Sequence, residues 1–294
     1  MFSKAYALAV QFTVPIIISM RHHSGECSAS VGTCVIINED GWMLTAYHIV
    51  NQFQQIIESH KKYNELLEQR KAIENNQSLK PHVRHQQLKS FKIPNDAITR
   101  FSIHFGLDNV SLGQIHAIPP VDIAVCQLLN FNKDNIKAYP KFNNISGPIE
   151  APGTSLCKLG FPFHDIKPVY NDKLNSFDLS GSLPLPFFPL EGIYTRTINL
   201  EIANSPYNYP LQYIETSSPG LLGQSGGPTF DVNGTIWAIQ SSTKHLKLGF
   251  GNGIQTKSKE NEHLQNQYMN VGWGTHFATI TRFLTEKNIK FYYF

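Results

Sequence analysis

A serine in a glycine-rich turn is the residue of this chain best placed for covalent chemistry. Ser225 lies in the sequence Gly-Gln-Ser-Gly-Gly-Pro at 223–228, and the backbone N–H groups of such a turn can converge on one point. A serine hydroxyl is a weak nucleophile until a base takes its proton, so the chemistry also requires a histidine and an orienting acid. His48, in Thr-Ala-Tyr-His, and Asp122, in Asp-Ile-Ala-Val, are of these types. We therefore expect Ser225 to attack, His48 to transfer the proton and Asp122 to orient His48.

The elements that must hold these three residues are expected to be strands. Short β-branched and aromatic runs, such as those at 34–37, 123–125 and 236–239, are separated by Gly, Pro, Asn and Asp, which is typical of an all-β fold. His48 comes shortly after the first of these runs, and Asp122 directly precedes the second. The predicted chemistry therefore lies at strand ends.

Four segments together carry a resemblance to a known family. They are the block from Gly32 to His48, Asp-Ile-Ala-Val at 122–125, the serine region at 216–228, and Val-Gly-Trp-Gly-Thr-His-Phe-Ala at 271–278. In this order they resemble the chymotrypsin-fold serine peptidases, and most closely the bacterial trypsin-like branch that includes the high-temperature-requirement proteases. The resemblance is expected to stop at the protease domain, without a peptide-binding PDZ domain.

The resemblance implies an all-β fold of two six-stranded antiparallel β-barrels within a single trypsin-like peptidase domain over 1–294. The first barrel is expected at about 10–140, including a helical insertion at 52–90 after the first catalytic residue, and the second at about 150–285. A short C-terminal helix is expected at 281–290.

The resemblance also implies an activity, that of a serine endopeptidase acting on protein or peptide substrates through an acyl-enzyme. The N–H groups of Gly223 and Ser225 would form the oxyanion hole. The alternative is a catalytically inactive peptidase-like module that binds an extended peptide without cutting it.

Two departures from better-known branches of the family bear on control and specificity. Digestive members have an aspartate before the nucleophile that pairs with a newly cut N-terminus; Gln224 stands there, so activation by clipping is not expected. Members that cut after basic residues have an aspartate six residues before the serine, where this chain has Pro219. We expect an apolar, small or uncharged polar preference, and His276 leaves acidic substrates as a minority alternative. The implied substrate-binding residues are Pro219, Ile239, Gln240, Ser241, Ser242, Thr275 and His276.

Three segments interrupt the strand pattern. Residues 52–88 hold no Gly and repeat apolar residues at helical steps, which predicts a helix that either elaborates the barrel or docks a regulatory partner. Residues 161–190 are rich in Pro and aromatics, which predicts a loop without sheet strands. This loop is either an ordinary surface loop or a lid over the substrate cleft. Residues 244–270 are polar and glycine-containing, which predicts a flexible hairpin excursion.

Composition limits the classes of partner and location. The chain has 294 residues, of which 41% are hydrophobic, and a formal net charge of +3, too small to indicate nucleic acid or an anionic membrane surface as partner. The apolar stretch at 5–20 is too short and polar to span a membrane and lacks a signal-peptide cleavage site. The family resemblance implies that 14–21 is the first strand of the fold instead. We expect a cytoplasmic protein, with secretion or a periplasmic location as the alternative.

The four cysteines leave two redox states open, two disulfides or free thiols. Free thiols are favoured because three of the four lie in apolar runs, as small buried hydrophobes do, and none has zinc-site spacing. No metal or other cofactor is expected. The cysteines are Cys27, Cys34, Cys126 and Cys157.

Overall fold

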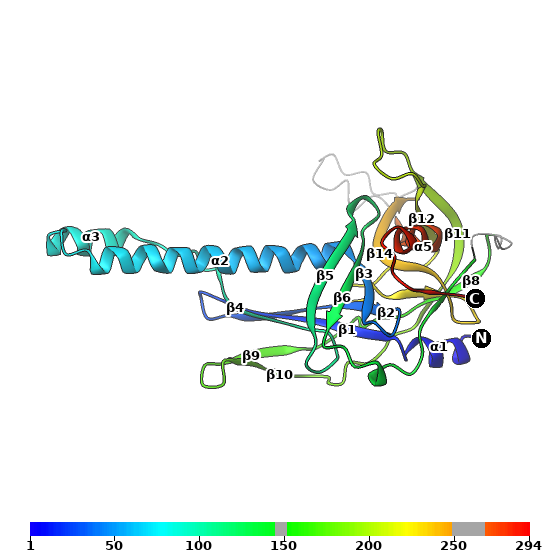
Figure 1. Ribbon diagram of the computed structural model, residues 1–294, viewed down its shortest axis with the longest axis horizontal. Helices are drawn as coiled ribbons and strands as arrows, with labels where there is room; N and C mark the ends of the chain where they lie inside the picture. Colours follow the sequence, from blue (N-terminus) through cyan, green and yellow to red (C-terminus); the bar gives the residue numbers. More distant parts are fainter. Residues whose placement is uncertain (145–151, 249–267) are drawn as a thin grey trace, which may run out of the picture.

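The computed structural model describes residues 1–144, 152–248 and 268–294, and its body consists mainly of two β-sheets (Figure 1). The first sheet has six strands and all its pairings are antiparallel. Within the described residues no pairing joins its two edges, so this sheet is a half-barrel. In spatial order its strands are β4 Ile98–His104, β1 Thr13–His22, β2 Cys27–Ile36, β3 Trp42–Ala46, β6 Ile123–Leu129 and β5 Ser111–Ile118.

The second sheet closes into a ring of six antiparallel strands, because its first strand also pairs with its sixth. Two short strands, β7 Lys141–Phe142 and β16 Tyr292–Tyr293, add to it in parallel beside the sixth ring strand. Around the ring the strands are β13 Pro228–Phe230, β8 Ser155–Lys158, β11 Leu190–Leu200, β12 Leu211–Thr216, β15 Tyr268–His276 and β14 Thr235–Lys247.

The expectation of a mostly β, chymotrypsin-like architecture is confirmed, and that of two closed barrels only in part. The first strand runs from Thr13 to His22, close to the predicted 14–21. A helix that the sequence did not reveal, α1 Ser3–Ala9, precedes it. The C-terminal helix, α5, spans Phe277–Glu286, a few residues before the predicted 281–290, and places one apolar side in the core.

The predicted helical insertion exists but begins earlier than expected. Helix α2 spans Tyr47–Asn75 and therefore contains His48, and α3 Pro81–Ser90 follows it. Only its first three turns are buried, so the rest projects from the body with α3 at its far end (Figure 1). Near the point where it leaves the body, His60 Nδ1 lies 3.1 Å from the carbonyl oxygen of Ile98, the first residue of β4. The buried residues are Ile49, Val50, Phe53 and Ile56.

The Pro-rich segment contains a β-hairpin, which corrects the prediction of a loop without strands. Strands β9 Lys167–Asn171 and β10 Ser176–Ser180 pair with each other and with no other strand of the described chain. Pro168 fits there because a two-stranded ribbon leaves half of its N–H groups without a ladder partner. Residues 181–189 carry no strand, as predicted, and Leu185 among them packs against the first sheet.

The polar excursion at 244–270 is partly strand, because β14 extends to Lys247 and β15 begins at Tyr268. The predicted flexible tip, at 249–267, lies outside the described residues. All four cysteines are free thiols, and three are buried in β2, β6 and β8, as expected from their apolar surroundings. Burial raises the pKa of Cys126 to about 12 and that of Cys157 to about 11, so both stay protonated at neutral pH.

Within the described residues, no helix is both long and apolar enough to span a membrane.

Candidate active site

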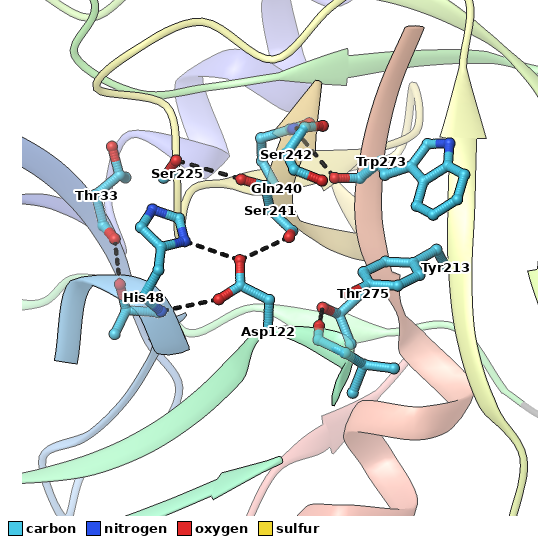
Figure 2. A network of polar contacts seen from close by, with 12 residues as sticks. Thr33, His48, Asp122, Tyr213, Ser225, Gln240, Ser241, Ser242, Trp273 and Thr275 are labelled. Atoms are coloured by element: carbon cyan, nitrogen blue, oxygen red, sulfur yellow. Dashed lines mark hydrogen bonds and ion pairs between the residues drawn. The ribbon is translucent and has the colours of Figure 1, made fainter. Parts of the chain in front are cut away.

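The start of α2 and the loop before β6 bring His48 and Asp122 together. The imidazole Nδ1 of His48 lies 2.8 Å from Asp122 Oδ2, and the backbone N–H of His48 donates to Asp122 Oδ1 at 2.8 Å (Figure 2). The backbone N–H of Tyr47 donates to the Asp122 carbonyl at 3.1 Å. Helix α2 has no side-chain N-cap of its own, since residue 46 is Ala, so the Asp122 carboxylate serves as its cap. One carboxylate therefore fixes both the helix start and the imidazole.

The Asp122 carboxylate is held in its ionised form. Burial opposes ionisation, but the hydrogen bonds and charge of His48 and the hydrogen bond of Ser241 outweigh it, so the pKa of Asp122 is lowered from 3.8. The Ser241 hydroxyl donates to Asp122 Oδ2 at 2.6 Å. The residue also has a left-handed backbone, with φ +54°, which among non-glycine residues Asp and Asn adopt most readily. Strain of this kind gathers at functional sites.

Thr275 and Tyr213 hold the turn that carries Asp122. Thr275 Oγ1 donates to the carbonyl of Val121 at 2.5 Å, and Tyr213 Oη donates to that of Pro120 at 3.1 Å. Both belong to strands of the second sheet, so this sheet positions the acid that orients His48, at the start of α2 (Figure 2).

The turn around Ser225 packs directly against β2, which pairs with β3, the strand that leads to His48. The backbone N–H of Thr33 in β2 donates to the Ser225 carbonyl at 2.9 Å, and Thr33 Oγ1 donates to the Gly223 carbonyl at 2.7 Å. A Cβ at Gly226 would lie 3.0 Å from the backbone nitrogen of Ala46 and 2.1 Å from the Thr33 carbonyl oxygen. Glycine at 226 thus permits the approach of the two sheets at this point.

The hydroxyl of Ser225 donates to the Ser241 carbonyl at 3.4 Å (Figure 2). Within the described structure it makes no hydrogen bond to His48, whose side chain is 51% exposed. Catalytic hydrogen bonds are often long or misaligned before substrate binds, so the missing bond does not by itself exclude a catalytic pair.

The turn has the backbone features that an oxyanion hole requires. Gly223 has φ +95°, and a Cβ there would lie 2.4 Å from the Phe161 carbonyl oxygen, so only glycine fits. The N–H groups of Gln224, Gly226 and Gly227 all donate to backbone carbonyls. The N–H groups of Gly223 and Ser225 donate to no backbone carbonyl of the described residues. These two donors are therefore available to a ligand.

Gln224 is fully buried and ties the turn to the Pro-rich segment. Its Oε1 accepts from the backbone N–H of Leu221 at 3.1 Å, and its Nε2 donates to the Phe188 carbonyl at 3.2 Å. The sequence identified this residue as a neutral replacement for an aspartate. The structure gives it a role in which both ends of a neutral amide are used.

Three of the seven predicted substrate-binding residues make contacts within the protein that the sequence did not predict. Ile239 is buried in the main core. Thr275 is also fully buried, and its hydroxyl donates to the Val121 carbonyl. His276 caps α5, since its Nδ1 accepts from the Ala278 N–H at 3.0 Å, and burial lowers its pKa to about 4. A neutral capping histidine does not supply a charge for acidic substrates.

The other four lie around the turn that precedes Ser225. The carbonyl of Pro219 accepts from Lys158 at 3.0 Å, and the carbonyl of Ser242 accepts from Gln240 Nε2 at 3.1 Å. The side chain of Ser241 donates to Asp122 Oδ2, so it supports the acid. Lys158 was missed by the sequence analysis, although a lone lysine in the apolar run at 155–159 was a signal that could have found it.

A family model for the trypsin-like peptidase domain matches residues 32–239, more than half of the chain, including positions 48, 122 and 225. No match was found among the curated proteins. Among solved structures, the Rv3671c protease of M. tuberculosis in its active form is similar at 12% identity and TM-score 0.48, covering 98% of this chain and 86% of that chain. The HtrA-type protease AlgW with a tripeptide is similar at 14% identity and TM-score 0.48, covering 99% of this chain and 64% of that chain.

Proposed function

The chain belongs to the trypsin-like peptidase family, and on that premise we propose that it is a serine endopeptidase with His48, Asp122 and Ser225 as its catalytic triad. The observation that carries the proposal is the Asp122 carboxylate, which accepts from both the backbone and the imidazole of His48. With Nδ1–H donating to Asp122, the opposite ring nitrogen of His48 is left as the proton acceptor that a general base needs.

In the proposed reaction the Ser225 hydroxyl turns from the Ser241 carbonyl to His48 Nε2 and attacks the scissile carbonyl carbon. His48 takes the hydroxyl proton, and the carbonyl oxygen becomes an anion that the N–H groups of Gly223 and Ser225 bind. His48 then gives the proton to the leaving amine, which departs and leaves an acyl-enzyme on Ser225. Water, deprotonated by His48, releases the acid and restores the serine.

We further propose that an extended peptide binds along the edge of β14 at 241–243. Beyond Ile239 this strand no longer pairs with β13, and its free edge faces the Ser225 turn. A substrate that adds as a strand there satisfies main-chain groups of the sheet edge and brings its carbonyl to the serine. The projecting part of α2, together with α3, is proposed as a docking element for a regulatory partner. It is exposed and contributes no buried residue to the core beyond Ile56.

The alternative, a module that binds peptides without cutting them, has one observation in its favour, the absence of a Ser225–His48 hydrogen bond in the described structure. Cleavage profiling of a proteome-derived peptide library separates the two. The endopeptidase predicts cuts by the wild type that Ser225→Ala abolishes. Peptide binding by both proteins with no cut by either would establish the binding module instead.

A further inference from the structure

Lys158 is a buried lysine that the proposed catalytic steps do not use. Only 1% of its surface is exposed, and it is the last residue of β8. The ammonium donates to the carbonyl of Ser218, to the hydroxyl of Ser218 at 3.0 Å and to the carbonyl of Pro219 at 3.0 Å. All three partners are neutral oxygens, and no carboxylate of the described chain forms an ion pair with it. Buried ammonium groups are costly and are usually paired with an anion.

The ammonium lies beside the segment that leads to the nucleophile. Pro219 is six residues before Ser225, and Ser218 and Pro219 follow β12. On the other side is Gly272 of β15, where a Cβ would lie 2.4 Å from Lys158 Nζ. Because residue 272 is a glycine, the ammonium fits between the Ser218–Pro219 segment and β15.

Side chains of β14 connect this segment to the proposed substrate strand through hydrogen bonds. The Thr243 hydroxyl donates to the Gly220 carbonyl at 2.6 Å and accepts from the Gly220 N–H at 2.9 Å. Gln240 Nε2 packs over Gly220, where a Cβ would approach it to 2.1 Å. A substrate side chain placed between these walls would replace the Thr243–Gly220 pair.

Displacing that pair releases two donors, the Thr243 hydroxyl and the Gly220 N–H, and one acceptor, the Gly220 carbonyl, close to a cation. An apolar side chain would leave all three without partners, and a basic one could satisfy only the carbonyl while it adds a like charge. A carboxylate has only acceptor oxygens and carries the opposite charge, so it satisfies the released donors and compensates Lys158 together. Burial lowers the pKa of Lys158 to about 7, which shows how poorly its present neutral partners compensate the charge.

We propose that Lys158 determines the specificity of this site and that the enzyme cuts after residues with an acidic side chain, aspartate or glutamate. The inference rests on the proposed peptidase function and deepens it. It replaces both the uncharged preference expected from Pro219 and the role considered for His276, since the cation comes from a different strand.

The test uses a set of peptides that differ only in the residue before the scissile bond, which is Glu, Gln, Ala or Lys. The wild type is expected to prefer Glu over Gln by about 100-fold in kcat/KM, the size of selection that a buried charged partner gives. Lys158→Met keeps the length of the side chain and removes the charge, and it is expected to bring that ratio close to one. Lys167→Met, at a lysine 71% exposed on the separate hairpin, is the matched control and should keep the wild-type ratio.

Efficient cleavage after Ala, Gln or Lys with Glu disfavoured would overturn the inference and leave the peptidase function intact. Failure to cut any peptide, with no labelling of Ser225 by a serine-directed probe, would remove the peptidase function and the inference with it. If Lys158→Met does not fold, Thr243→Val serves as the second variant. It leaves the lysine in place and removes one donor, so it should lower the Glu-to-Gln ratio by about tenfold, and an unchanged ratio would count against the pocket described here.

Discussion

Replacing Asp122 by asparagine tests the orientation of His48 with the least disturbance of the backbone. Asparagine tolerates the left-handed conformation of residue 122 as well as aspartate does, so the turn should keep its shape. The carboxylate now accepts three hydrogen bonds, from the backbone and ring of His48 and from the Ser241 hydroxyl. An amide has one acceptor oxygen and one donor nitrogen, so it cannot satisfy all three.

The two orientations of the amide both carry a cost. If its oxygen stays on the His48 N–H, its NH2 group faces the imidazole Nδ1, which must then accept, and the ring proton moves to the nitrogen that should receive the Ser225 proton. If the amide is reversed, its NH2 faces the helix N–H of His48, donor against donor at the positive end of α2. We expect the first orientation to prevail because it keeps the helix cap.

An imidazole held in the wrong tautomer lowers turnover by about 10⁴-fold, equivalent to about 5.5 kcal/mol of transition-state stabilisation. The mismatched Ser241 hydroxyl and helix start should lower the free energy of unfolding by about 1–3 kcal/mol. Steady-state kinetics on a good substrate and urea unfolding measure the two effects separately. Asp134→Asn, at an exposed position, is the control and should match the wild type in both. A folded Asp122→Asn enzyme that keeps more than a tenth of wild-type kcat/KM would refute the reasoning.

Three further predictions follow from the turn and the helix. Gly223→Ala should lower kcat by at least about 100-fold with a smaller change in KM, because its Cβ would lie 2.4 Å from the Phe161 carbonyl oxygen and shift an oxyanion donor; kinetics that match the wild type would contradict this. Gln224→Met should lower the free energy of unfolding by about 1–3 kcal/mol, because the Leu221 N–H and the Phe188 carbonyl lose their hydrogen bonds in a buried site. Urea unfolding measures this free energy, and an unchanged value would count against a stabilising role for the Gln224 amide. Replacing residues 62–95 by a short Gly/Ser linker should leave kcat/KM on short peptides unchanged, because the burial of α2 ends at Ile56; a large loss would show that the projecting part orders the site.

The last of these revises what the sequence alone indicates about the insertion. From the sequence alone, a deletion of the insertion would begin near Gln52, where the helix was predicted to start. The structure shows that such a deletion would remove Phe53 and Ile56 from the core, so loss of activity would report unfolding. A deletion that starts beyond the buried turns isolates the arm itself, and any effect limited to protein substrates would support partner docking there.

The parts of the fold that the sequence predicted are those fixed by local pattern. Short β-branched runs bounded by turn residues identified the strands around Cys34 and Ile123, and helical spacing identified α2. The start of α2 could not be placed, because its cap is the Asp122 carboxylate from 74 residues along the chain and not a local Ser, Thr or Asp. Closure of the ring sheet likewise depends on the pairing of β13 with β14 and not on any single segment.

The site shows the same division between local pattern and tertiary contact. The order of His48, Asp122 and Ser225 could be read from motifs, and the structure places the first two in direct contact. The surroundings of the other residues could not be read in this way, since Thr275 hydrogen-bonds to the Val121 carbonyl and Lys158 to the Pro219 carbonyl, both far away in the sequence. Contacts between residues far apart in the sequence give only a weak sequence signal, in this case one lysine among apolar neighbours.

The most direct test of the central claim, that Ser225 is a nucleophile activated by His48, is covalent labelling with a fluorophosphonate probe followed by mass spectrometry of the digested protein. The account predicts one adduct per chain, on the peptide that contains Ser225, formed rapidly by the wild type and by the Lys167→Met control. It predicts no adduct with Ser225→Ala and a rate lowered at least about 10³-fold with His48→Ala. A folded wild-type protein that stays unlabelled, or an adduct that forms equally fast without His48, would contradict it.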